Sequence, residues 1–164
     1  MHPVASLPWC VIGAETGRPG ALKNLRAAGI AAECLEREDG LGGNWNFGAR
    51  TSRVFASTRL VSSKTLTAYR DHPMPRQWPA YPDHRQCLEY LRGYARRFGL
   101  EQHIRTGVEV ERVAPAGAPG TGWVVRTAAG DSRAYAGIVV ASGHNHVPRM
   151  PDVPGTFTGT LLHA

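Results

Sequence analysis

WCVIGAETGRPGALKNLRAAGIAAECLE, residues 9–36, is the stretch that decides the fold. Its first four residues (9–12) form a short apolar run that predicts a strand, and Gly13 then predicts a turn. Apolar residues recur at helical spacing over 21–28, and the glycine that follows is a typical helix end. Residues 30–35 are again apolar and of strand length. The order strand, helix, strand predicts a β-α-β unit with parallel strands and a right-handed crossover.

The middle of the chain has no regular pattern. Glycine and proline interrupt residues 36–82, with a short helix predicted only around 64–69. A loop of this length inside a compact domain is usually functional. Asp83 is a typical helix cap, and the helix after it is expected to expose its Arg and Tyr positions and to bury one apolar face. The residues expected on that buried face are Leu88, Leu91, Ala95 and Phe98.

The C-terminal third is predicted to be mostly strands. Residues 108–113 alternate in polarity, and 123–127 and 132–135 flank the turn sequence AAGD, so the three runs predict a β-meander. The continuous apolar run 138–141 predicts a buried parallel strand that ends at Ser142-Gly143. The expected fold class is α/β, a Rossmann-like parallel sheet with a β-meander in three layers.

Composition limits the possible classes of protein. With 164 residues, 42% apolar and 20% charged, the chain is expected to form one soluble globular domain. Its net charge of +6 suits anionic ligands, but the basic residues are scattered and no nucleic-acid-binding motif is present, so no nucleic-acid partner is expected. Three widely spaced cysteines indicate buried thiols in a reducing compartment. Without a leader or an apolar run of ~20 residues, the expected location is cytoplasmic, with no membrane segment.

The turn GAETGRPG, residues 13–20, stands where a phosphate-binding turn G-x-G-x-x-G belongs. Gly13 occupies the first position, but Glu15 and Arg18 replace the second and third glycines. Glu15 would bring bulk and negative charge to a diphosphate, at a cost on the order of a few kcal/mol, whereas Arg18 could pair with a phosphate. Glu36, at the end of the second predicted strand, is placed to accept hydrogen bonds from ribose hydroxyls. The turn alone fits an ordinary loop, and its surroundings indicate a damaged diphosphate site.

Three segments resemble flavin-containing monooxygenases. EREDGLGGNW, residues 36–45, is similar to the E-x(5)-G-G-x-W segment of that family. VVASG, residues 139–143, resembles its strand ending in A-(T/S)-G, and FTGTLLH, residues 157–163, resembles the first half of its F-x-G-x-x-x-H motif. The three occur in the family's order, and the resemblance covers essentially the whole chain.

The resemblance implies an oxidoreductase that holds FAD, reduces it with NADPH and uses O₂ to oxygenate a small molecule with a soft nitrogen or sulfur nucleophile. Because the flavin carries the chemistry, no catalytic side chain is expected. Family members run to over twice this length and bind NADPH in a second glycine fingerprint. Residues 1–164 are therefore expected to be an FAD-binding domain, an incomplete N-terminal portion without the NADPH domain and inactive alone.

The resemblance also implies a set of cofactor-binding residues. Residues 42–45 match the paired glycines and the segment along the cofactor, and Val110 matches a strand position whose backbone meets adenine. Ser62 and Ser63 match a loop near the isoalloxazine ring, but Val61 replaces the Asn that many members carry before them. The complete set is Gly13, Glu36, Gly42, Gly43, Asn44, Trp45, Ser62, Ser63, Val110, Ser142 and Gly143.

Two alternatives remain open. The first is a related flavoprotein, a Baeyer-Villiger monooxygenase or an amine hydroxylase, which shares the first nucleotide-binding unit. The second is a truncated, non-catalytic nucleotide-binding fold that binds FAD weakly or not at all. No metal site is expected, because His144, His146 and His163 lack ligand spacing, and the oligomeric state is not predicted.

Overall fold

The computed structural model describes residues 6–13, 18–143 and 149–161. Within these ranges, four strands form a parallel sheet in the order β3-β2-β1-β7. Their bounds are Trp9–Ile12 (β1), Ala32–Leu35 (β2), Ile104–Arg105 (β3) and Gly137–Val140 (β7). A second, antiparallel sheet has the order β4-β5-β6, with bounds Val110–Pro115, Trp123–Thr127 and Ser132–Tyr135.

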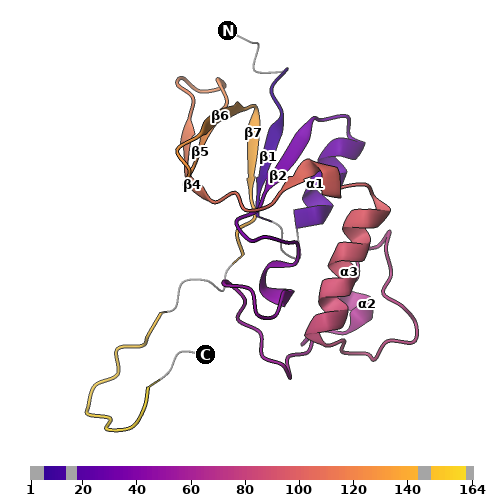
Figure 1. Cartoon of the computed structure of the whole chain (residues 1–164), viewed down its shortest axis with the longest axis vertical. Coiled ribbons are helices and arrows are strands. Elements are labelled where there is room, and N and C mark those ends of the chain that lie inside the picture. Colours follow the sequence, from indigo (N-terminus) through magenta and orange to yellow (C-terminus); the bar gives the residue numbers. More distant parts are fainter. Residues whose placement is uncertain (1–5, 14–17, 144–148, 162–164) are drawn as a thin grey trace.

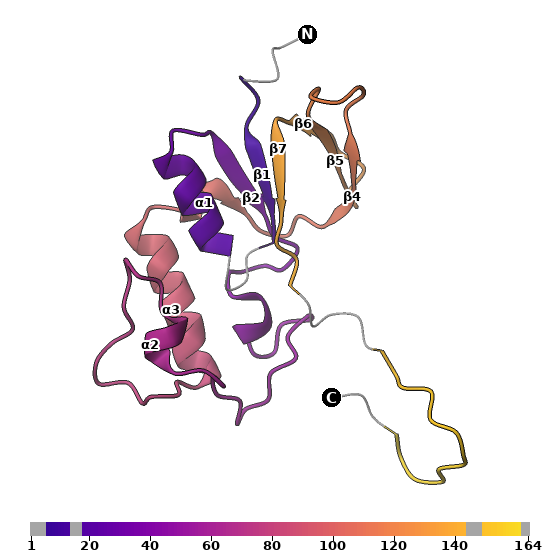
Figure 2. The same cartoon turned by 180° about the vertical axis from the view of Figure 1, so that it is seen from behind.

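Helices cover one side of the parallel sheet. They are α1 (Arg18–Ala27) and α3 (His84–Arg97), which pack against β1. The other helical elements are α2 (Lys64–Thr67) and the 3₁₀ turns η2 (Gly43–Trp45) and η3 (Glu101–His103). The antiparallel sheet lies on the side of β7 away from the helices (Figure 1). Residues 149–161, drawn in yellow, extend away from the body in both views (Figures 1 and 2).

The parallel sheet is the middle layer of three. Successive side chains of a strand point to opposite faces, so Val11 and Cys10 of β1 enter different cores. Val11 packs with Leu22 of α1 and Tyr94 of α3, whereas Cys10 packs with Tyr135 of the antiparallel sheet. The predicted α/β class and the β-meander are confirmed.

The β-α-β unit forms as predicted, with shifted ends. Helix α1 begins at Arg18, earlier than the apolar spacing indicates, because Pro19 is well suited to a first helical turn. At the other end, Gly29 has φ +76°, and the Ile30 N–H donates to the Leu25 carbonyl at 3.0 Å. This closure is typical of a glycine C-cap. Because Ile30 bonds to the end of the helix, β2 begins at Ala32, two residues later than predicted.

Helix α3 begins at its predicted cap but buries a different face. Leu91 and Ala95 are buried as expected. Tyr90 and Tyr94, predicted to be solvent-exposed, are only 5% and 2% exposed. The prediction was wrong because the partners of these rings come from the irregular segment. The Tyr69 ring lies 4.2 Å from that of Tyr94, centre to centre, and the Tyr90 hydroxyl accepts a hydrogen bond from the Tyr69 N–H at 2.7 Å.

The cap of α3 carries a pH-dependent prediction. The Asp83 carboxylate accepts the Gln86 N–H at 3.0 Å, and the Gln86 side chain accepts the Asp83 N–H at 3.0 Å. The first of these bonds lowers the pKa of Asp83 below its ordinary 3.8. A lowered carboxyl pKa stabilises the fold above the unfolded pKa, and this stabilisation is lost as pH falls through the folded pKa. We expect Asp83→Ala to cost about 1 kcal/mol at pH 7 and progressively less below the ordinary Asp pKa.

Urea unfolding at pH 7 and at pH 3 measures this difference. Asp83→Asn is the matched control, because its uncharged amide oxygen still caps the helix and does not titrate. A cost of Asp83→Ala that is the same at both pH values would contradict the cap assignment.

The two outer strands of the parallel sheet, β7 and β3, differ from the prediction. Strand β7 is parallel, as predicted, and pairs with β1, but Val140 at its end is 68% exposed, so the expectation of a buried strand was wrong for this residue. Among the described strands β7 is paired on one side only. Strand β3 was not predicted, because two residues are too short to show a pattern.

The thiols are buried as expected. Cys10, Cys34 and Cys87 are all buried, and none of them is in a disulfide. Burial raises the pKa of Cys10 and of Cys87 to about 12, so these two are protonated at neutral pH. None of the helices in the described part of the chain is long and apolar enough to cross a membrane.

Candidate functional site

Gly13 and Glu36 lie together at one edge of the parallel sheet. Strands β1 and β2 are parallel, with Ile12 opposite Leu35. Each predicted residue therefore follows directly on a paired strand end. The Gly13 N–H donates to the Leu35 carbonyl at 2.6 Å, and Gly13 has φ +99°, a conformation that favours glycine. Gly13 can thus adopt a sharp backbone bend directly after β1.

Ser142 and Gly143 reach the same edge from β7. Val140 pairs opposite Ile12, and the Ala141 N–H donates to the Ile12 carbonyl at 3.1 Å. The chain then leaves the sheet at Ser142, and both predicted residues are exposed. Three of the predicted segments therefore meet outside the carboxyl ends of neighbouring parallel strands, the place where open α/β sheets bind ligands.

The Glu36 side chain is held firmly at this edge. It is only 3% exposed, and its Oε1 accepts the N–H of Glu38 at 2.9 Å. Its backbone N–H donates to the Arg105 carbonyl at 2.9 Å, and its carbonyl accepts the Val108 N–H at 2.8 Å. A buried side chain whose backbone is fixed on both sides and whose Oε1 is already hydrogen-bonded is preorganised as an acceptor.

The double glycine makes a turn beyond these strand ends. Gly42 and Gly43 have φ of +125° and +51°, and both are buried. A Cβ on Gly42 would lie 2.2 Å from Cδ1 of Leu88 on α3. The preceding Leu41 packs against the core that contains Val11 of β1. Both views show the turn beyond the ends of β1 and β2 (Figures 1 and 2).

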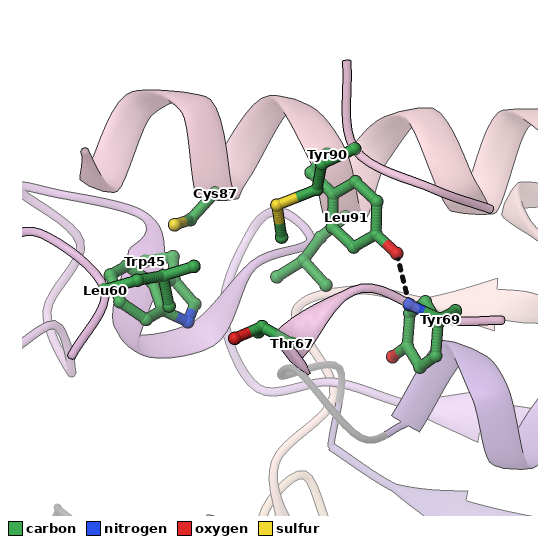
Figure 3. A pocket seen from close by; sticks show the side chains of 8 residues that line it. Trp45, Leu60, Thr67, Tyr69, Cys87, Tyr90 and Leu91 are labelled. Carbon is green, nitrogen blue, oxygen red and sulfur yellow. Dashed lines mark hydrogen bonds between the residues drawn. The ribbon is translucent and has the colours of Figure 1, made fainter. Parts of the chain in front are cut away.

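Asn44 and Trp45, which follow the double glycine, make contacts within the protein. Asn44 Oδ1 accepts the Arg53 N–H at 2.6 Å, and its carbonyl accepts the Ser52 hydroxyl at 2.7 Å, so Asn44 holds the next loop in place. Trp45 forms one wall of a small apolar cavity of about 20 Å³ between this segment and α3 (Figure 3). The other lining residues are Leu60, Thr67, Tyr69, Met74, Cys87, Tyr90 and Leu91.

The two predicted serines belong to the segment that packs on α3. The Ser62 hydroxyl hydrogen-bonds that of Thr67 at 2.7 Å, and Ser63 is the N-cap residue of α2, with its carbonyl accepting the Thr67 N–H. Val61, which replaces the expected Asn, is 98% exposed. Val110 starts β4, opposite Thr127, and packs against the core on the meander side of the sheet.

Some predicted features fall outside the described residues. These are Glu15 with the rest of 14–17, and His144, His146 and His163. Arg18 is placed as the first residue of α1, without a description of its side chain. Among the residues that are described, no three His, Cys, Asp or Glu side chains gather as metal ligands would.

Comparison with known proteins agrees with this arrangement. The family model described as flavin-binding monooxygenase-like matches residues 9–164. The chain belongs to this family. A flavin-containing monooxygenase of Arabidopsis thaliana, FMO GS-OX-like 5, is 28% identical over the whole chain, which spans 43% of that relative. The chain thus covers less than half the length of this curated relative.

Solved structures share the fold of this flavin-binding monooxygenase-like chain. S-allyl-L-cysteine S-oxygenase from Allium sativum superposes with a TM-score of 0.80 at 23% identity, over 91% of this chain and 39% of the other. A steroid monooxygenase bound to NADP superposes with a TM-score of 0.74 at 26% identity, over 84% of this chain and 26% of the other.

One acidic residue of the flavin-binding monooxygenase-like chain was missed at this edge. Glu38 is 7% exposed, two residues beyond Glu36. Its Oε1 lies 4.0 Å from Nε of Arg50. The only signal in the sequence was a second acid soon after the strand end, and acids in a glycine-rich loop are normally solvated.

Proposed function

We propose that residues 1–164 form an FAD-binding unit, and that the protein is a flavin-dependent monooxygenase that uses NADPH and O₂ to oxygenate soft nitrogen or sulfur nucleophiles. The observation that carries the proposal is the buried Glu36 carboxylate, fixed beside Gly13 where two parallel strands end. Ribose offers neighbouring hydroxyl donors, and an ionised carboxylate accepts hydrogen bonds without donating any.

The described residues fit the adenosine and diphosphate portion of FAD. Glu36 supplies the acceptor for the ribose hydroxyls, and the N-terminus of α1, at Arg18, favours negative charge through the helix dipole. Because Gly42 has no side chain, the backbone of this turn can lie close to α3. When bound, the flavin supplies the redox and oxygen chemistry. The residues of this chain bind it and fix its position.

The whole protein's use of NADPH rests on similarity. The related steroid monooxygenase structure contains NADP, and we propose that NADPH binds this protein outside residues 1–164. Oxygenation of ketones is a second candidate, favoured by the likeness to cyclohexanone monooxygenase, with a TM-score of 0.76 at 25% identity. Product analysis with a thioether and a cyclic ketone distinguishes the two activities.

Replacing Glu36 by glutamine tests the proposed cofactor site. Glutamine keeps the acceptor for the Glu38 N–H but loses the charge that strengthens hydrogen bonds to the ribose. We expect the dissociation constant of FAD to rise about tenfold to a hundredfold, since hydrogen bonds to charged groups contribute about 1.5–3 kcal/mol. Quenching of flavin fluorescence on titration measures the binding.

Glu89→Gln is the matched control, because Glu89 is exposed on α3 and the charge change is the same. We expect it to leave FAD affinity unchanged. If both variants weaken FAD binding equally, the loss in Glu36→Gln is a general effect of net charge. The main support for the site would then be removed.

A further inference from the structure

Glu38 is a buried charge with unused hydrogen-bonding capacity. In the described part of the chain, two buried side-chain oxygens lack a hydrogen-bond partner, Oε1 of Glu38 and Oγ1 of Thr127. Of the two, only Glu38 is a carboxylate, and its residue is 7% exposed. A charged acceptor left unsatisfied in the interior costs more than a neutral one. Its position therefore needs an explanation.

The backbone fixes Glu38 beside the first carboxylate. Its N–H donates to Oε1 of Glu36 at 2.9 Å, and its carbonyl accepts the Gly107 N–H at 2.8 Å. These bonds hold the loop after β2 against the segment that leads into β4. The two carboxylates consequently belong to one rigid loop at the ligand-binding edge of the sheet.

Arg50 does not satisfy the free oxygen. Its Nε is 4.0 Å from Oε1 of Glu38, beyond hydrogen-bond distance, and its Nη2 is 3.6 Å from Oε2 of Glu109. The Arg50 side chain is 67% exposed, so water screens its attraction for both acids. Oε1 of Glu38 therefore remains available as an acceptor.

An ionised carboxylate can only accept, so its ligand must bring an N–H or O–H group. The adenosine portion of a dinucleotide carries an exocyclic amine and ribose hydroxyls. We propose that Glu38 is a second specificity-determining residue of the nucleotide site, accepting a hydrogen bond from the amine or a hydroxyl of the adenosine portion. This inference rests on the proposed function, because it requires the adenosine of the cofactor to lie at this edge.

Binding of ADP to the full chain tests the inference without the flavin. We expect Glu38→Gln to weaken ADP binding about tenfold in isothermal titration calorimetry, the loss typical of a hydrogen bond to a charged group. Three analogues each lack one donor group of ADP: purine riboside 5′-diphosphate lacks the amine, and 2′-deoxy-ADP and 3′-deoxy-ADP each lack one ribose hydroxyl. The analogue that lacks the donor to Glu38 is expected to bind the wild type and the variant equally.

The control separates recognition from structural damage. Glu109→Gln removes the other acid near Arg50 and is expected to leave ADP affinity unchanged. The inference would be overturned if Glu38→Gln binds ADP as tightly as the wild type does. It would also be overturned if the variant loses the same affinity for ADP and for all three analogues. If Glu36→Gln weakens FAD binding while Glu38→Gln changes nothing, only this inference fails. A wild-type chain that binds neither FAD nor ADP would overturn both this inference and the proposed function.

Discussion

Tyr94→Ala is expected to lower the free energy of unfolding by about 3–5 kcal/mol, the range for removing a large buried aromatic ring. Tyr94 is 2% exposed, and its ring centre lies 4.2 Å from that of Tyr69 and 4.7 Å from that of Phe98. It joins the core above the parallel sheet to the irregular segment that carries Tyr69. Its loss leaves a cavity between α3 and that segment. Urea unfolding followed by circular dichroism measures the effect.

Tyr94→Phe is the control, because it keeps the ring and removes only the hydroxyl. We expect it to cost no more than about 1.5 kcal/mol, the net contribution of an ordinary hydrogen bond. If alanine and phenylalanine cost the same, the ring packing is not what stabilises this region.

Gly42→Ala is the second change expected to be severe, at about 2–4 kcal/mol. An L-residue at φ +125° is strained by about 1–3 kcal/mol, and the new Cβ would also displace Leu88, 2.2 Å away. Overpacking of this kind adds about 1–3 kcal/mol, less where the flexible leucine gives way. Chemical denaturation measures the cost, and FAD titration is expected to show weakened binding because the turn moves.

Gly48→Ala separates the two contributions. Gly48 also has a positive φ, +87°, but nothing lies within 4 Å of a Cβ there. We expect a cost of about 1–2 kcal/mol from conformation alone. In a Leu88→Ala background the cost of Gly42→Ala is expected to fall toward that value. A Gly42→Ala variant as stable as Gly48→Ala in the wild-type background would contradict the close approach to α3.

Local patterns in the sequence were sufficient for the elements whose stability is local. The apolar run at 9–12, the cap at Asp83 and the turn between β5 and β6 each determine their element through neighbours a few residues away. The candidate site followed from the same elements, because parallel strands place Gly13 and Glu36 at one edge without any tertiary information.

Features set by distant partners could not be predicted in this way. Tyr90 and Tyr94 are polar enough to suit a helix surface, and only the irregular segment, through Tyr69, makes them core residues. Val140 is apolar, but its position beside β1 at the sheet edge leaves it exposed. Glu38 is an ordinary loop acid in the sequence, and its carbonyl accepts the N–H of Gly107, which is distant in the sequence.

The pairing of β1 on both sides has a consequence for biosynthesis. Trp9 pairs with Ala32 on one side and with Gly137 on the other. On the ribosome the first partner emerges almost at once, whereas the second emerges only after the intervening chain has been translated. Until then the nascent β1 presents bare backbone donors and acceptors that can recruit other chains. Such a distant closure also slows folding.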